Sequence, residues 1–402
     1  MELYKYFPIA NDRMGTIWTL AAIKDACIIE FGPSGTTHYA VEGIGSLNGE
    51  DAASIYSTHM DDSDVTFGKM QRLELAIREL DQNLKPKYIF VLASSISAII
   101  GSDIESVCFD LETQVNATLI PLTTGGLKYQ YPKGIENTLL MLVKKLVKPH
   151  EVDKKRYNIL GFTMDKYNYQ SDVEEMKRMM SVLFDKEVNT IFTCGCGIDE
   201  LERASQASLN IVVRKEALKA AKYMEKHFGI PYVYQNIYGL ENIKLFIKAV
   251  QTVAGYELDE VNYEKELALL KPHLFSVKRK FMFYKESKDC AVYGDYDTVV
   301  GFKDLLTELN LNVAHQEVIY NETSDKTITS GRSEFERMKH LKEQSYYLLL
   351  GDGPTLDMSH HSKLDIQISN PNLHQINVYP YTPYMGFRGM HYIIEKILNI
   401  RA

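Results

Sequence analysis

An apolar strand that runs directly into a glycine turn and then a helix sets the architecture that we expect for this chain. The strand is Ala26–Phe31, and the turn that follows it is Gly-Pro-Ser-Gly at 32–35. An apolar run without polar alternation is typical of a strand that is buried on both faces of a parallel sheet. Because parallel strands are joined by crossover helices, the pattern predicts βα units.

The strand–helix alternation recurs about three times along the chain. The second series opens with a strand at 157–163, and the third opens with a strand at 289–294. This recurrence favours an α/β fold of repeated doubly wound domains, with helices on both faces of parallel sheets. The charged stretch 148–156 is predicted to be a linker. Residues 259–286 are predicted to form a long helical connector that is interrupted near Pro272.

In such sheets a ligand binds beyond the carboxyl ends of the strands, where the loops converge. We therefore expect functional residues in the turns that follow the predicted strands. These turns lie at 32–37, 94–97, 123–126, 193–197, 294–297 and 351–354.

Bulk properties exclude several classes of protein. The chain has 402 residues, which is too long for one compact core. A net charge of −8 argues against nucleic acid as a partner, because no basic surplus is present. No apolar run approaches the roughly 20 residues that cross a membrane, and the first residues do not resemble a signal peptide.

Five cysteines form no disulfide framework, so a cytoplasmic location is expected.

Several short segments, taken in order, resemble the nitrogenase component 1 family over nearly the whole chain. No single match is specific, but their order and spacing are. The segments are Gly-Pro-Ser-Gly at 32–35, Ser57–Gly68, 100–104, Gly197–Leu201, 209–212, Tyr223–Pro231, Val292–Asp295 and Tyr384–Gly389.

The resemblance implies three Rossmann-like domains around a central cleft. We expect them at 1–150, with the subunit interface and a degenerate cluster site, at 151–286 together with the helical connector, and at 287–402 with a C-terminal helix. It also implies a homologous component 1 subunit, or a second copy of this chain, as a partner. An ATP-dependent iron protein would deliver electrons. Dark-operative protochlorophyllide reductase belongs to the same superfamily, so the resemblance implies nitrogen reduction as only one of several possible outcomes.

The bridging cluster of this family is held by three cysteines per subunit, because thiolates suit iron–sulfur centres. In this chain the three positions fall at Ala10 or Asn11, at Thr36 and at Ser95. Amides and neutral hydroxyls are poor iron ligands. We therefore predict that any iron–sulfur cluster is shared with a partner subunit or held by it.

The larger nitrogenase cofactor also lacks its ligands here. The resemblance places its cysteine at Arg214 and its histidine at Ile376, so no iron–molybdenum cofactor is expected. Arg214 offers a planar cation that suits a carboxylate or phosphate group, which makes it a candidate cofactor-binding residue. The alternative is a structural ion pair with a nearby acid.

Two cysteines remain as a candidate metal and cofactor site. Cys194 and Cys196 are separated by one residue in a loop after a predicted strand. Two close thiolates can bind a soft metal or a cluster, or can cycle as a dithiol. The alternative is a pair of inert thiols in a tight turn. The other three cysteines are predicted to be core residues; they are Cys27, Cys108 and Cys290.

An acidic segment resembles a metal-binding loop at first sight. It contains Asp61, Asp62 and Asp64, close to His59. Capping of a helix at 69–82 explains these carboxylates more simply, because acids favour helix N-termini. His38 is expected at the cleft or the subunit interface. The pair at 360–361, His-His, is expected on the surface.

These features favour a subunit of a nitrogenase-like reductase complex whose cluster ligands come from a partner. Its catalytic residues are not identifiable from the sequence. A second hypothesis is a non-catalytic scaffold or carrier for a metallocofactor or tetrapyrrole. A third is a homodimer with a metal-free cleft that takes a small anion at Arg214.

Overall fold

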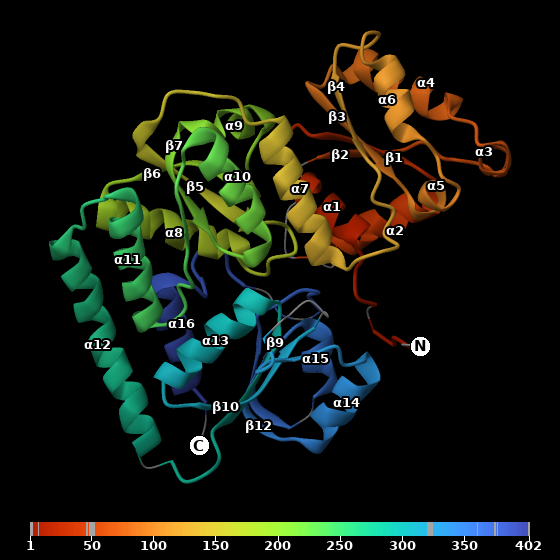
Figure 1. Cartoon of the computed structure of the whole chain (residues 1–402). Helices are drawn as coiled ribbons and strands as arrows, with labels where there is room; N and C mark the ends of the chain where they lie inside the picture. The colour runs from red at the N-terminus through yellow and green to blue at the C-terminus, as the bar shows by residue number, and fades with distance from the viewer. Residues whose placement is uncertain are drawn as a thin grey trace.

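The structure is a computed structural model. It describes residues 3–6, 8–45, 47, 53–282, 284–319, 325–359, 361–373, 375 and 377–400. Three parallel β-sheets, each with its own helices, form three lobes (Figure 1).

The first sheet has four strands in the order β2-β1-β3-β4. The strand β1 is buried along its whole length, as the apolar run predicts. The strands are β1 (Cys27–Phe31), β2 (Ser54–Ser57), β3 (Tyr88–Ala93) and β4 (Thr118–Leu122). The helices are α1 (Asp12–Ala21), α2 (Ser34–Gly45), α3 (Asp62–Phe67), α4 (Gln71–Leu84), α5 (Ser95–Ile99), α6 (Ile104–Leu111) and α7 (Tyr131–Lys145).

The second sheet has the order β6-β5-β7-β8. Its strands are β5 (Asp153–Phe162), β6 (Glu187–Thr193), β7 (Ala207–Val212) and β8 (Tyr232–Tyr234). The helices are α8 (Tyr169–Phe184), α9 (Ile198–Glu202), α10 (Leu218–Phe228), α11 (Leu240–Ala254) and α12 (Glu260–Met282), with 3₁₀ turns η1 (Arg203–Gln206) and η2 (Lys215–Ala217).

The third sheet has five strands in the order β11-β10-β9-β12-β13. They are β9 (Asp289–Gly294), β10 (Asn312–Val318), β11 (Thr329–Ser330), β12 (Tyr346–Gly351) and β13 (Ser362–Gln367). The helices are α13 (Tyr296–Glu308), α14 (Glu334–Glu343), α15 (Gly353–Met358) and α16 (Gly386–Leu398).

The expected α/β fold with three Rossmann-like units is confirmed. In every sheet the first strand in the chain lies between later ones, and all strand pairs are parallel. This order places a switch point beside β1, β5 and β9, where loops at the carboxyl ends diverge and leave room for a ligand. The exact domain boundaries stay a prediction.

Two local expectations were wrong. The end of the predicted linker already belongs to β5, because Arg156 pairs with Glu187 and Asp153 pairs with Ala207. Exposed charged side chains do not prevent a backbone from pairing at the end of a sheet. The connector is one continuous helix that contains Pro272 in its interior. Packing of α12 against α16 and α8 compensates for the backbone donor that proline lacks.

The helices α1 and α7 cross with their backbones in contact. A Cβ atom on Gly15 would lie 2.0 Å from the Tyr131 carbonyl oxygen, and one on Gly134 would lie 1.9 Å from the Asp12 carbonyl oxygen. Both distances are far below van der Waals contact, so only glycine fits at these positions. The helix α7 also packs against α10, and it therefore joins the first sheet to the second (Figure 1).

The C-terminal helix α16 packs on α8, α11 and α12 of the second unit. The buried Asp172 of α8 accepts hydrogen bonds from the backbone N–H groups of Tyr384, at 2.6 Å, and Met385, at 3.1 Å. Glu175, one turn further along α8, accepts from the Arg388 N–H. These carboxylates satisfy backbone donors at the start of α16 and fix its position.

A Gly134→Ala substitution is expected to destabilise the protein by about 3 kcal/mol or more, because the two helices must separate to admit one methyl group. The matched control is Gly45→Ala in α2, where an added Cβ meets nothing within 4 Å. The control is expected to be neutral or slightly stabilising, because alanine favours helices. Urea unfolding measures both; equal effects would contradict the close crossing.

Burial raises the pKa of Asp172 to about 7, so the folded protein holds a proton that the unfolded chain releases near pH 4. The stability that this proton contributes is present at low pH and is lost as the pH rises toward 7. In Asp172→Asn the amide oxygen can still accept from the backbone, but it does not titrate. Between pH 5 and pH 7.5 we expect wild type to lose on the order of 2–3 kcal/mol more than the variant in urea unfolding. Parallel pH profiles would contradict this assignment.

Candidate functional site

A cleft lies among the three units and holds about 720 Å³ of empty space that is continuous with solvent. Its wall includes Trp18 of α1, Tyr131 of α7 and Asp165, which follows β5. The other side comes from the third unit and includes Arg337 and Asp352. The central cleft that the resemblance implies is therefore present in the structure.

The third sheet directs its carboxyl-end loops toward this cleft. Gly294, the last residue of β9, lines it together with Ile319, Asp352 and Ser369, which follow β10, β12 and β13. Two of the turns in which the sequence predicts functional residues, at 294–297 and 351–354, thus reach the cleft.

The N-terminal segment crosses the opening between the first and third units. Tyr4 and residues 8–10 line the cleft. The segment is tied to α14 by Glu334, whose carboxylate accepts the backbone N–H of Lys5 at 2.5 Å and that of Tyr6 at 3.1 Å. The first unit is therefore connected to the third through this segment.

Arg214 lies fully buried behind the cleft. Its Nη1 atom lies 2.9 Å from Asp165, and its Nε atom lies 2.8 Å from Glu216. The structure thus contains the ion pairs that the sequence leaves open as the alternative for this residue. A cofactor-binding role for Arg214 stays a prediction.

A second buried pair joins the second unit to the third. The Lys166 ammonium lies 3.0 Å from Asp295 and donates to Thr298 at 2.6 Å. Burial raises the pKa of Asp295, but Lys166 and Arg214 outweigh it and lower the pKa to about 2. Breaking such a pair leaves a buried charge without compensation, which costs several kcal/mol. The network therefore fixes how the two units meet.

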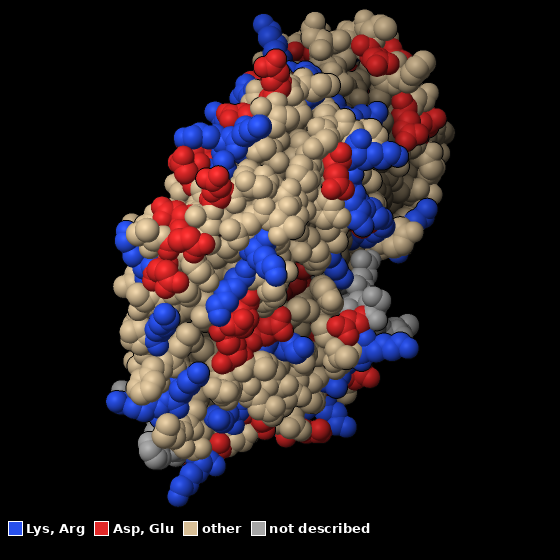
Figure 2. Space-filling view, turned by 60° about the vertical axis from the view of Figure 1, so that its left-hand side comes forward, with Lys and Arg blue, Asp and Glu red and all other residues tan. Residues whose placement is uncertain are grey.

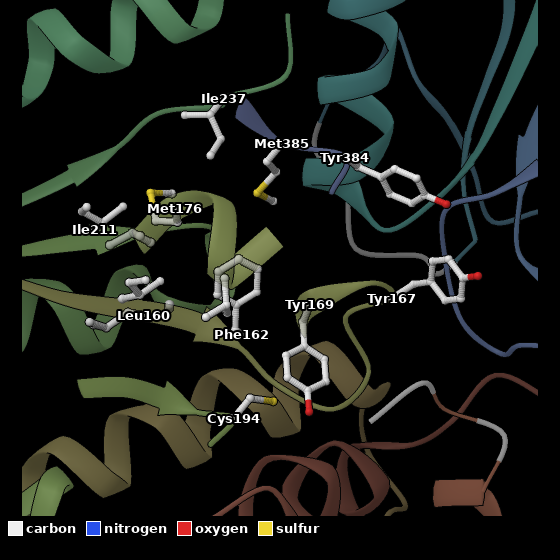
Figure 3. Close-up of a cluster of buried hydrophobic side chains, with 14 of the residues drawn as sticks. Leu160, Phe162, Tyr167, Tyr169, Met176, Cys194, Ile211, Ile237, Tyr384 and Met385 are labelled. Atoms are coloured by element: carbon white, nitrogen blue, oxygen red, sulfur yellow. The ribbon is translucent and has the colours of Figure 1, made fainter. Parts of the chain in front are cut away.

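The loop with Cys194 and Cys196 lies at the joint between the first and second units. The Cys196 carbonyl accepts the Lys24 N–H at 2.8 Å. The Thr193 hydroxyl donates to the Thr19 carbonyl at 2.6 Å. Figure 3 shows Cys194 beside Tyr169 within a cluster of buried apolar side chains.

The state of these thiols bears on metal binding, because the thiolate is the ligand form. Both side chains are buried, and burial raises the pKa of each thiol. The Cys196 thiol donates to the Thr193 carbonyl. Over the described ranges, no three His, Cys, Asp or Glu side chains are grouped so as to hold a metal ion. The metal role of Cys194 and Cys196 stays a prediction. Cys27, Cys108 and Cys290 are buried, as expected.

The three positions of the bridging cluster lie close to loops that converge at the carboxyl end of the first sheet; we call this region the degenerate cluster edge. A Cβ atom on Gly32 would touch both Ser94 and Thr36, and one on Gly126 would touch Asn11. Asn11 caps α1 by accepting from the Met14 N–H at 3.0 Å. The Thr36 hydroxyl donates to Pro33 at 2.8 Å, and Ser95 begins α5. Ile376 lies outside the described residues.

The acidic segment acts as a helix cap, although for a different helix from the one expected. Asp61 and Asp64 form a capping box at the start of the short helix α3. Arg72 pairs with both carboxylates at 2.6 and 2.5 Å. His38 is exposed 3.7 Å from Glu42. His360 lies outside the described residues, and His361 is exposed.

A family model described as nitrogenase component 1 type oxidoreductase matches residues 12–401. The chain belongs to this family. It is 31% identical over 255 residues to the nitrogenase iron-molybdenum cofactor biosynthesis protein NifE of Clostridium pasteurianum, with 62% of this chain and 54% of that protein aligned. It is 21% identical to one subunit of the light-independent protochlorophyllide reductase of Nostoc punctiforme, with 99% of this chain and 84% of that polypeptide aligned.

The fold matches a solved nitrogenase chain, Cp1 at pH 6.5, with a TM-score of 0.78, 16% identity, and coverage of 100% of this chain and 94% of that one. This likeness supports the fold. The match to the NifE relative spans about half of that protein's length. Within the described ranges, no helix has the length and apolar character needed to cross a membrane. On the face that carries α11 and α12, acidic and basic side chains are interspersed (Figure 2).

Several residues of the cleft were missed by the sequence reasoning. Trp18, Asp165, Arg337 and Asp352 lie in four separate elements or loops, and no local motif connects them. A signal exists for Asp352, because it follows the strong strand β12 in one of the predicted turns. Arg337 carries no such signal, because an arginine on an amphipathic helix is usually a solvated residue.

The five cysteines are expected to react with iodoacetamide at least about 100-fold more slowly in the native protein than in urea, because burial keeps the thiols protonated and inaccessible. Peptide mass spectrometry assigns the rate of each cysteine near neutral pH. Rapid native labelling of Cys194 or Cys196 would instead support a reactive dithiol or a metal site.

Proposed function

We propose that this chain is a subunit of a nitrogenase-like reductase complex that receives electrons from an ATP-dependent iron protein. In this proposal a homologous partner subunit supplies the ligands of any iron–sulfur cluster. Membership of the nitrogenase component 1 family supports a role in such a complex. The iron protein and the partner rest on the family resemblance.

The observation that carries the proposal is the degenerate cluster edge. Asn11, Thr36 and Ser95 converge, each is partly exposed, and none offers a thiol. These residues do not fit an iron–sulfur cluster, because amide and hydroxyl oxygens bind iron poorly and soft thiolates are absent. A cluster at this edge would therefore depend on another polypeptide.

The same edge has the character of an interface. Exposed apolar side chains lie on or beside the converging loops; they are Tyr39, Ile99, Leu127 and Tyr129. Exposed apolar side chains that gather around one feature mark interaction sites, and aromatic residues are enriched in the cores of interfaces. A homologous subunit that covers this edge would remove them from water.

A second function is a scaffold or carrier for a metallocofactor or tetrapyrrole. Its support is the similarity to NifE proteins, whose name describes biosynthesis of the iron–molybdenum cofactor. In this version Cys194 and Cys196 contact the cargo transiently. A Cys194→Ala/Cys196→Ala variant that binds iron or ligand as well as wild type would count against it.

Anaerobic purification together with the proteins encoded beside it tests the first function. We expect a stable complex with a component 1 homologue that retains its cysteines, and iron, sulfide and visible absorption in that complex. A purified chain with neither iron nor partner would overturn the proposal.

Two substitutions locate the interface. Ile99→Asp/Leu127→Asp is expected to weaken partner binding by at least about 100-fold, because two charges would be buried without partners. The matched control is Phe109→Asp, an equally exposed site in the last turn of α6, which leads into the opposite end of the first sheet. The control is expected to bind the partner normally.

A further inference from the structure

We propose that the cleft among the three units binds a small organic carboxylate, whose carboxylate group is held by Arg337 and whose apolar part lies against Trp18 and Tyr131. This inference concerns the isolated chain and does not rest on the proposed partner, iron protein or cluster.

Arg337 is the residue on which the inference depends. It lies on α14 and lines the cleft, and the exposed fraction of the residue is only 5%. Its Nε atom donates to Glu317 at 3.1 Å. Over the described residues, its two terminal nitrogens have no hydrogen-bond partner in the protein. A guanidinium group with one edge anchored and the other open matches the two oxygens of a carboxylate.

The acidic residues of the cleft are engaged within the protein. Asp165 pairs with Arg214, and Glu334 accepts backbone N–H groups of the N-terminal segment. Asp352 caps α15 through the Thr355 N–H at 2.8 Å. Among the described residues that line the cleft, Arg337 is the only lysine or arginine. Its open donors are therefore available to an incoming anion.

Asp352 also lines the cleft, beside Arg337. Burial raises the pKa of its carboxyl group, although Arg337 acts in the opposite direction. The carboxyl group already accepts the Thr355 N–H and so is held in place beside the cleft. A singly charged carboxylate is favoured over a fully charged phosphate, because the cleft offers one guanidinium group and also contains Asp165, Glu334 and Asp352.

The opposite wall is apolar and aromatic. The rings of Trp18 and Tyr131 lie with centroids 5.4 Å apart, and Pro8 and Ile9 also line the cleft. Small-molecule sites combine apolar walls with a few oriented polar groups, and the cleft has both. The ligand should therefore be amphipathic, with its carboxylate at one end.

Trp18 is the single tryptophan of the chain, so its fluorescence reports on the cleft alone. The probes are 3-phenylpropionate, 2-naphthoate and decanoate, each compared with its primary amide by tryptophan fluorescence and by calorimetry. We expect at least one carboxylate to bind saturably, with a Kd below about 1 mM, and its amide to bind at least about tenfold more weakly. No saturable carboxylate binding, or equal binding of acid and amide, overturns the inference.

Variants separate recognition from stability. Arg337→Gln is expected to weaken carboxylate binding by about tenfold or more. Arg332→Gln is the matched control, because Arg332 lies 3.5 Å from the same Glu317 but does not line the cleft. The control should bind the carboxylate like wild type. Normal binding by Arg337→Gln overturns the inference.

Arg337→Gln removes a partner of the buried Glu317 and can destabilise the fold. The double variant Glu317→Gln/Arg337→Gln removes the charge together with its partner, so it is expected to recover stability. We expect it to stay defective in carboxylate binding while its amide affinity is unchanged. If the double variant binds the carboxylate like wild type, Arg337 only stabilises Glu317 and the inference is wrong.

Discussion

The backbone contact between α1 and α7 is the constraint on which the arrangement of the three units rests. Gly15 and Gly134 let the two helices cross with no side chain between them. The Thr16 and Thr138 hydroxyls then meet at 3.1 Å, and Trp18 packs against Tyr131 to form one wall of the cleft. Because α1 leads back to the N-terminal segment and α7 packs on α10, this crossing connects all three units.

Buried charge is the second organising element, and it explains what the cleft can hold. Behind the cleft, Arg214 and Lys166 are each paired with carboxylates from the ends of neighbouring strands. Buried charges are tolerated when they are paired and hydrogen-bonded, and a group that separated these pairs would incur their desolvation cost. The position at which the resemblance places a cysteine ligand thus holds a paired cation, while a different arginine, Arg337, lines the cleft.

The existence of the main strands was more predictable from the sequence than the exact boundaries of the helices and strands. The strands β1, β3, β9 and β12 and the second half of β5 are largely apolar and buried, so their existence follows from composition and period alone. The polar start of β5 and the proline inside α12 were misread, because sheet pairing and helix packing supplied stability that local propensity lacks. The acids at 61–64 were correctly read as a cap, but the short helix α3 that they start has no periodic signal.

Residue identity alone established which chemistry is missing: no thiol stands at positions 11, 36 or 95, and no fold could add one. It also established the repeated βα architecture, because the alternation of apolar runs and amphipathic helices is a local property. The tertiary structure decided the rest. Whether Arg214 is paired, whether Cys194 and Cys196 are accessible, and which cation faces the cleft depend on contacts between elements that are far apart in the chain. Such contacts are fixed by how the three sheets pack, and nothing local in the chain encodes them.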